Sequence, residues 1–283
     1  MILIADSGST KCQWIIFNTH GENLFELETI GFNPHFVDDR FILSQLNASE
    51  LNQYKNRIDS LYFYGAGCGM QKQRLILADA FKQFFINSSI NIYHDLEAAC
   101  FAMYRGNPNI TCILGTGSNS CYFDGSNIIE NAPSLGFLLG DEASGNYFGK
   151  KILNLYFNNK LPQDLHMLFE KDFNPDLSLL KEKIYNNPRS NMHLASYFPF
   201  LVANKSHLVI KNIILDGLEH FFDLHVSCFK KYEVKEINFI GSVSFFLRDE
   251  ISEICHNHNL LIGDIIKNPI KKLIAYHINN NIL

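Results

Sequence analysis

The sequence predicts an α/β protein with two domains of one topology, each a mixed five-stranded sheet flanked by helices. Short apolar runs bounded by turn residues predict the strands, and amphipathic stretches between them predict the helices. The order strand, turn, strand, turn, strand occurs in residues 2–30 and again in residues 110–131. Because strands alternate with helices after each of these openings, βα crossovers within a mixed sheet are expected.

Five strands are expected in the first domain. They cover residues 1–5, 12–17, 23–30, 58–64 and 90–95. Successive side chains of a strand point to opposite faces of its sheet, so Trp14 and Ile16 are expected on one face and Ile15 and Phe17 on the other.

Three helices accompany these strands. Asp38 and Asp39 are good N-cap residue types for a helix that runs through Leu46. Residues 71–85 form an amphipathic stretch whose apolar face is expected to comprise Leu75, Ile76, Ala80 and Phe81. A third helix is expected over residues 96–104.

The stretch RGNPN (105–109) is the best candidate for a linker. We therefore place the N-terminal domain at 1–106 plus 267–283 and the second domain, with a helical insertion, at 107–266. After its opening strands, the second domain is expected to contain a long helical stretch (143–232), a strand in INFI, a helix near 245–256 and a strand in LLIGD. The last helix starts from Asn268, with Pro269 in its first turn, and closes the N-terminal domain.

Composition limits the functional classes. With 283 residues, 47% hydrophobic and 19% charged, the chain is typical of soluble globular proteins. A formal charge of −5 supplies no basic face for nucleic acid. No signal pattern or membrane-spanning run is present, which favours a cytoplasmic protein without a membrane partner. The seven cysteines form no C-x-x-C pair, so reduced thiols are favoured over a zinc or iron–sulfur site.

The stretch DSGST (6–10) joins the first two strands. Gly8 permits a tight turn, and its small neighbours leave backbone N–H groups accessible, which can form an anion-binding concavity. Asp6, at the end of the strand, would repel a bound anion unless a cation lies beside both. The stretch therefore suggests a site that holds a phosphate and a metal ion next to the Asp6 carboxylate. The alternative is an ordinary hairpin turn.

The stretch LGTGSNS (114–120) is the counterpart of DSGST in the second domain. It matches neither the Walker pattern nor the dinucleotide pattern, because a strand follows it. Two such turns facing each other across a cleft could clamp one polyphosphate. A third glycine turn, at Gly241 and Ser242, would let a flat ligand approach the backbone, although capping of a helix by Ser242 or Ser244 explains it equally well.

Two acidic positions are candidates for chemistry. Asp95 lies where a strand passes into a helix, so it is either an N-cap or a general base that accepts a proton from a substrate hydroxyl. Asp141 and Glu142 lie between glycines before a helix. They either complement the helix dipole, or Asp141 accepts hydrogen bonds from a polyhydroxyl ligand.

These turns, in this order, resemble those of the actin-like ATPase superfamily of sugar kinases, hexokinases and chaperone ATPases. IADSGSTKCQWIIF is similar to its first phosphate motif, ITCILGTGSNSCYF to its second and NFIGSV to its adenosine motif. GTGSNS followed by LGFLLGDEASG is similar to the N-acetylglucosamine kinase branch, grouped with BadF/BadG/BcrA/BcrD ATPases. The resemblance implies two actin-like (ribonuclease H-like) domains with an interdomain cleft.

The resemblance also implies roles for single residues. Asp6 would hold Mg²⁺ through water, and Asp95 would be the catalytic base. ATP and its phosphates would be bound by Ser7, Gly8, Ser9, Thr10, Lys11, Gly115, Thr116, Gly117, Ser118, Gly241 and Ser242. The sugar would be bound by Asn33, Cys68, Asp95, Thr116 and Asp141. Lys271 and Lys272 depart from the pattern, because a small residue is usual in that connector helix.

The function that the resemblance implies is transfer of the γ-phosphoryl group of ATP to an N-acetylated amino sugar, with N-acetylglucosamine preferred. Its cofactors would be ATP and Mg²⁺, and a homodimer is left open. Three alternatives remain. They are a kinase for N-acetylmuramate or glucosamine, a BadF-type ATPase activator of a dehydratase with a cluster at Cys112 and Cys121, and a non-catalytic sugar sensor.

Overall fold

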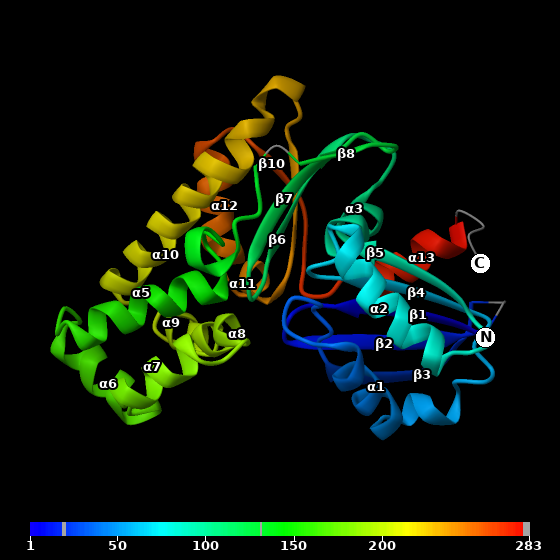
Figure 1. The fold of residues 1–283 in the computed structure, drawn as a ribbon. Coiled ribbons are helices and arrows are strands. Elements are labelled where there is room, and N and C mark those ends of the chain that lie inside the picture. Colours follow the sequence, from blue (N-terminus) through cyan, green and yellow to red (C-terminus); the bar gives the residue numbers. More distant parts are fainter. Residues whose placement is uncertain (19–20, 131, 280–283) are drawn as a thin grey trace. The chain divides into compact units, whose positions relative to one another are not determined.

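The computed structural model describes residues 1–18, 21–130 and 132–279, and the chain divides into two compact units (Figure 1). Unit 1 comprises Met1–Arg105 together with the segment that begins at Asn268, and unit 2 is Gly106–Lys267. None of the helices in these described residues is long and apolar enough to cross a membrane.

Unit 1 is built on a five-stranded sheet in the order β3-β2-β1-β4-β5. Its strands are β1 (Ile2–Ser7), β2 (Lys11–Phe17), β3 (Asn23–Ile30), β4 (Ser60–Gly65) and β5 (Ser89–His94). β2 is antiparallel to both of its neighbours, whereas β1, β4 and β5 run parallel. The predicted mixed sheet is confirmed, and the carboxyl ends of three parallel strands meet at one edge.

Helices cover both faces of this sheet (Figure 1). They are α1 (Asp39–Ala48), the short 3₁₀ helix η1 (Glu50–Gln53), α2 (Gln71–Phe84), α3 (Asp95–Met103) and α13 (Ile270–Asn279). Trp14 and Ile16 lie in the core cluster beneath α1 and α2, whereas Ile15 and Phe17 lie in the cluster with α3 and α13. The predicted alternation along this strand is therefore confirmed.

The predicted apolar face of α2 is partly wrong. Leu75 is 52% exposed, and the residues that α2 buries are Leu77, Ala80, Phe81 and Phe84. Their spacing of three, four and seven positions is that of one helical stripe, and the sheet beneath the helix selects this stripe.

The helices α3 and α13 pack against each other despite the lysines at 271 and 272. Leu273 is buried in the cluster that contains Ala98 of α3. The rings of Phe101 and Tyr276 stack with centroids 4.6 Å apart. Lys271 is exposed, so its side chain does not separate the two helices.

Unit 2 repeats the topology of unit 1. Its sheet has the order β10-β9-β6-β7-β8, with strands β6 (Asn109–Leu114), β7 (Ser118–Phe123), β8 (Ile128–Ile129), β9 (Glu236–Ile240) and β10 (Leu261–Ile266). The first three strands in sequence are again consecutive antiparallel partners, and β9 again lies parallel to the first of them. The two predicted five-stranded sheets are thus confirmed.

The helices of unit 2 form one core with one face of the sheet. They are α4 (Gly136–Leu139), α5 (Gly145–Phe157), α6 (Gln163–Phe173), α7 (Leu177–Tyr185), α8 (Ser190–Ala195), α9 (Phe198–Ala203), α10 (Leu208–Phe221), the π segment η2 (Phe222–Val226), the 3₁₀ segment η3 (Ser227–Tyr232), α11 (Ser242–Phe246) and α12 (Arg248–Asn257). The predicted single helix over 245–256 is in fact two helices, which meet at the buried Leu247.

Candidate active site

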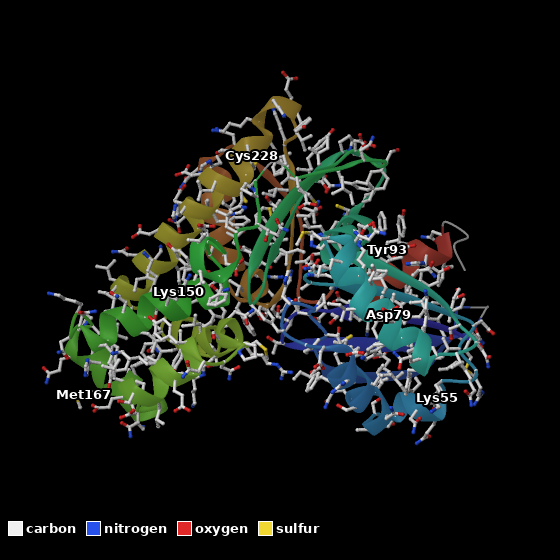
Figure 2. The ribbon with its side chains drawn as sticks, viewed as in Figure 1. Lys55, Asp79, Tyr93, Lys150, Met167 and Cys228 are labelled. Atoms are coloured by element: carbon white, nitrogen blue, oxygen red, sulfur yellow. The ribbon has the colours of Figure 1, made fainter. Side chains whose placement is uncertain are left out.

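Three of the predicted site residues in unit 1 lie at the carboxyl edge of its parallel strands. Asp6 is near the end of β1, Cys68 follows β4, and Asp95 follows β5. In open α/β sheets, ligands bind outside the carboxyl ends of the strands. Tyr93, near the end of β5, marks this edge in Figure 2.

The turn between β1 and β2 is tight and supported by the end of β3. The Gly8 N–H donates to the Lys11 carbonyl at 3.0 Å. The Ser7 hydroxyl is fully buried and accepts the Phe32 N–H at 2.9 Å. A Cβ on Gly31 would overlap the Gly8 carbonyl oxygen, so only glycine lets these two backbone segments approach so closely.

Asn33 is buried beside this turn. Its Nδ2 donates to the Ser9 hydroxyl at 3.0 Å, and its Oδ1 accepts the His35 N–H at 3.0 Å. A Cβ on Gly67 would overlap Asn33 Oδ1, which places the loop after β4 against the same amide. The structure thus brings Ser9 and Asn33 together within unit 1.

The carboxyl group of Asp6 is strongly perturbed. Burial is the main cause that raises the pKa of Asp6 to about 7; the charge of Asp95 raises it further and that of Lys11 lowers it. Lys11 also forms an ion pair with Glu28, in which Lys11 Nζ lies 2.9 Å from Glu28 Oε2. Two carboxylates therefore lie near each other with incomplete compensation by a cation.

Asp95 is not the N-cap of α3, so that alternative is wrong. His94 occupies the N-cap position, and the Glu97 carboxylate accepts the His94 backbone N–H at 2.7 Å. Asp95 Oδ1 is buried and makes no hydrogen bond within the described residues, although His94 Nε2 lies 3.0 Å away. The carboxyl group of Asp95 thus does not cap the helix.

Cys68 is fully buried, and burial raises the pKa of its thiol to about 12. Arg74 of α2 donates from Nε to the Cys68 carbonyl at 2.6 Å and lies 3.4 Å from the Glu97 carboxylate. Cys68 is therefore a protonated thiol in a loop that Arg74 fixes, and not a reactive nucleophile.

The predicted residues of unit 2 converge in the same way. The turn Gly115–Ser118 closes with a hydrogen bond of 2.9 Å from the Gly115 N–H to the Gly117 carbonyl. Asp141 Oδ1 accepts the Ser118 N–H at 3.3 Å, and Asp141 Oδ2 accepts from Asn146 Nδ2 at 2.6 Å. The two motifs GTGS and GDEASG, separate in the sequence, thus form one polar cluster.

Asn146 connects this cluster to the start of α5. Its side-chain Nδ2 and its backbone N–H both donate to the Thr116 carbonyl, at 2.7 and 3.1 Å. The Gly145 N–H donates to the Gly115 carbonyl at 2.8 Å. Sequence reasoning missed Asn146, because its bonds to Thr116 span 30 residues and no local pattern points to them.

Burial raises the pKa of Asp141 above its usual range, and the bonds from Asn146 and Ser118 oppose the rise. Asp141 also has a positive φ of 61°, which is uncommon for a residue with a side chain. Its carboxylate is thus held on the glycine turn at a conformational cost.

Gly241 lies against the same glycine turn. Its φ is +124°, and a Cβ there would overlap the Leu114 carbonyl oxygen just before Gly115. Gly241 is itself the N-cap of α11 without a side-chain bond, and the Ser244 hydroxyl donates back to the Gly241 carbonyl at 3.0 Å. Capping by Ser242 or Ser244 therefore does not explain this turn. Glycine is needed at position 241 because two backbone segments approach each other closely there.

None of the seven cysteines, all of which lie in the described residues, forms a disulfide, and Cys112 and Cys121 are buried within their strands. Among the described residues, no group of three or more His, Cys, Asp or Glu side chains is arranged to hold a metal ion. The shallow hollow of about 530 Å³ between α2 and β5 includes none of the predicted site residues.

A solved structure from Porphyromonas gingivalis, provisionally named an N-acetylglucosamine kinase, is 32% identical to the chain. The match covers 99% of this chain and 100% of the other, with a TM-score of 0.91. The chain belongs to the sugar kinases of the actin-like ATPase superfamily. The expectation drawn from its turns is therefore confirmed at the level of fold and superfamily.

Two more distant structures share the fold of this sugar kinase. One, from Chromobacterium violaceum and also provisionally named an N-acetylglucosamine kinase, is 16% identical over 98% of this chain and 99% of the other, with a TM-score of 0.70. A ROK-family glucokinase from Streptomyces griseus, in complex with glucose and AMPPNP, is 13% identical over 97% of each chain, with a TM-score of 0.56. No family model and no curated protein matches the chain.

Proposed function

We propose that this sugar kinase transfers the γ-phosphoryl group of ATP to a hydroxyl of an N-acetylated amino sugar, with N-acetylglucosamine as the preferred acceptor. The similarity to the P. gingivalis protein supports this choice of sugar. Most of the acceleration would come from positioning and from neutralising phosphate charge, because phosphoryl transfer requires little covalent chemistry.

The single observation that carries the proposal is the state of Asp95. Its carboxylate lies at the carboxyl edge of three parallel strands, caps no helix, and keeps one buried oxygen without a hydrogen bond among the described residues. His94 Nε2 lies 3.0 Å from this oxygen but outside hydrogen-bond geometry, so the oxygen keeps its capacity to accept a hydrogen bond. Such an oxygen is suited to accept the proton of a sugar hydroxyl as that hydroxyl attacks phosphorus.

The first turn of unit 1 and Asp6 would bind the nucleotide and its metal ion. The turn from Ser7 to Lys11 would bind phosphates through its backbone. Asp6 fits a magnesium ion, because the negative charge of Asp95 lies near its carboxylate and the charge of Lys11 balances it only in part. Mg²⁺ is usually held by one or two carboxylates, water and phosphates. A bound Mg²⁺ would supply charge neutralisation on the phosphates.

In unit 2, Gly115–Ser118 would bind the γ-phosphate side, and Gly241 with Ser242 would contact the adenine. Asp141 and Thr116 would bind the sugar, together with Asn33 and Cys68 of unit 1. Asn146 is added to this set, because its Oδ1 is buried and without a hydrogen bond in the described chain, and this atom can accept from a sugar hydroxyl.

A coupled assay of ADP release tests the proposal. The purified protein is mixed with MgATP and, in turn, N-acetylglucosamine, N-acetylmuramate, glucosamine and glucose. We expect the highest kcat/KM with N-acetylglucosamine and little release without sugar. If another sugar gives the highest value, the acceptor is corrected.

The absence of sugar-dependent release, with sugar binding retained in calorimetry, would instead identify a sensor. Iron bound after anaerobic purification would favour the dehydratase activator, although the burial of Cys112 and Cys121 disfavours it.

A further inference from the structure

A buried Glu–His pair lies directly behind the Asp141 cluster in unit 2. His225 Nε2 is 2.9 Å from Glu142 Oε2, and the two residues are 5% and 7% exposed. His225 Nδ1 is buried without a hydrogen bond in the described residues. The imidazole is thus held at its Nε2 by Glu142.

Glu142 lies in a strained part of the chain. The residues on either side of it, Asp141 and Ala143, have φ angles of 61° and 54°. Left-handed backbone at residues other than glycine is retained only where surrounding contacts enforce it. The hydrogen bond to His225 is the contact through which the Glu142 side chain holds this loop.

His225 also contacts the strand that carries the glycine turn. Its carbonyl accepts the Ser120 hydroxyl of β7 at 2.6 Å, and its ring stacks on Phe221 with centroids 5.0 Å apart. His225 belongs to the π segment η2 at the end of α10, and such segments are frequent at functional sites. One residue thus holds the loop by its side chain and β7 by its backbone.

We propose that Glu142 and His225 are positioning residues, which hold Asp141 on the Gly115–Ser118 turn and so set the affinity and alignment of the sugar. The inference rests on the proposed function, because it takes Asp141 as a ligand of the sugar. Neither residue touches the reacting atoms in this account; each acts through Asp141. A displacement of about 1 Å at such a group is enough to reduce turnover about 10²-fold.

The molecule offers a control pair of the same chemistry on α10, the helix that η2 follows, where the side chains are 22% and 43% accessible. Glu219 of α10 accepts from His258 Nε2 at 2.8 Å, which is the same chemical pair away from the Asp141 loop. Glu142→Ala breaks the first pair, Glu142→Gln keeps an oxygen that can accept from His225, and Glu219→Ala breaks the control pair. All three variants are compared at equal fractions folded, checked by thermal unfolding.

The kinetic result expected for Glu142→Ala is a fall of at least ~10-fold in kcat/KM for the sugar, larger than any rise in the KM for ATP, because the Gly115–Ser118 turn keeps its own backbone hydrogen bond. Glu142→Gln should regain most of this loss, and Glu219→Ala should match the wild type. Equal kinetics of Glu142→Ala and Glu219→Ala would overturn the proposal, as would equal losses for both substrates.

Hydrogen exchange gives a readout that needs no substrate. The amides of Gly145 and Asn146, which donate to Gly115 and Thr116, should exchange at least ~10-fold faster in Glu142→Ala than in the wild type. Unchanged exchange there contradicts the proposal even if a sugar is phosphorylated, whereas faster exchange supports it even if no sugar is. Should Glu142→Ala fail to fold, His225→Phe, which keeps the ring packed on Phe221, replaces it in both measurements.

Discussion

The turns at residues 7–11 and 115–118 occupy the same place in the same topology, between the first two strands of each sheet, but they are supported differently. In unit 1 the support comes from the chain just after β3, where the Gly31 N–H donates to the Thr10 carbonyl at 3.1 Å. In unit 2 it comes from the start of α5, through Gly145 and Asn146. Topology therefore fixes where the turn lies, and not what holds it.

The two turns also differ in charge. In unit 1, burial and, to a smaller extent, the nearby charge of Asp95 raise the pKa of Asp6. In unit 2, burial also raises the pKa of Asp141 and the Glu142 charge adds to the rise, but two hydrogen bonds to the Asp141 carboxylate oppose it. Under the proposed function, unit 1 supplies the reactive and metal-binding groups, and unit 2 supplies a preorganised set of hydrogen bonds.

The largest expected effect comes from Asp95→Asn in unit 1. The amide cannot accept the proton of the sugar hydroxyl, so kcat should fall at least ~10²-fold while sugar binding changes only a few-fold. Steady-state ADP release and calorimetry measure the two quantities.

Asp79→Asn is the control for this variant, since Asp79 lies exposed on α2 of the same unit (Figure 2). Turnover of Asp95→Asn at the wild-type rate would remove Asp95 from its proposed role and leave the carboxylates of unit 1 without a catalytic task.

The second effect tests the support of the first turn. Gly31→Ala should destabilise the protein by about 2–3 kcal/mol, because its Cβ would overlap the backbone of Gly8. Gly8→Ala should cost under ~1 kcal/mol, since the nearest atom to its Cβ would be 3.8 Å away. Urea unfolding measures both. Equal losses would mean that the turn itself, and not its contact with residue 31, determines stability.

Much of this architecture was predictable, because it depends on local signals. Hydrophobic runs predicted the strands, and the alternation from Trp14 to Phe17 assigned each side chain to the correct face. The glycine turns were predicted because a tight turn with closely approaching backbone needs glycine and small side chains, and these residues are visible in the sequence. Leu75 was placed wrongly, since more than one apolar stripe fits α2 and the sheet decides among them.

The supports of the site were not predictable. The bond from Asn146 to Thr116 spans 30 residues, and that between Glu142 and His225 spans 83. Each depends on the packing of elements that are distant in sequence, so no local pattern encodes it. The role of Gly31 was missed for the same reason, because it contacts the β1–β2 turn, which lies well before it in the sequence.

The third effect concerns the buried carboxylates, whose charge is stabilised differently in the two units. The pKa of Asp6 is raised from 3.8 to about 7, so between these values the folded state holds a proton that the unfolded state has lost. Stability therefore declines as pH rises from about 4 to 7. Without Mg²⁺, Asp6→Asn should be more stable than the wild type at pH 8 by about 1–3 kcal/mol, a value discounted for solvent access.

This stability difference should close as the pH falls towards 4, and urea unfolding in a chelating buffer follows it. Asp141→Asn is the comparison from unit 2, where the bonds from Ser118 and Asn146 oppose the rise in pKa. Its gain should be smaller, or become a loss. A constant difference between Asp6→Asn and the wild type from pH 4 to 8 would contradict the electrostatic origin.

The smallest effect sharpens the same contrast. Lys11 lowers the pKa of Asp6, but its ion pair with Glu28 is exposed, with side chains 43% and 52% accessible. Exposed pairs contribute little, so Lys11→Ala should change stability by under ~0.5 kcal/mol. The pKa of Asp6 should nevertheless rise, as a carboxyl titration by NMR would detect. Glu28→Gln keeps the lysine charge and should leave that pKa unraised. If both variants raise it equally, the ion pair, and not the Lys11 charge alone, restrains the carboxylates of unit 1.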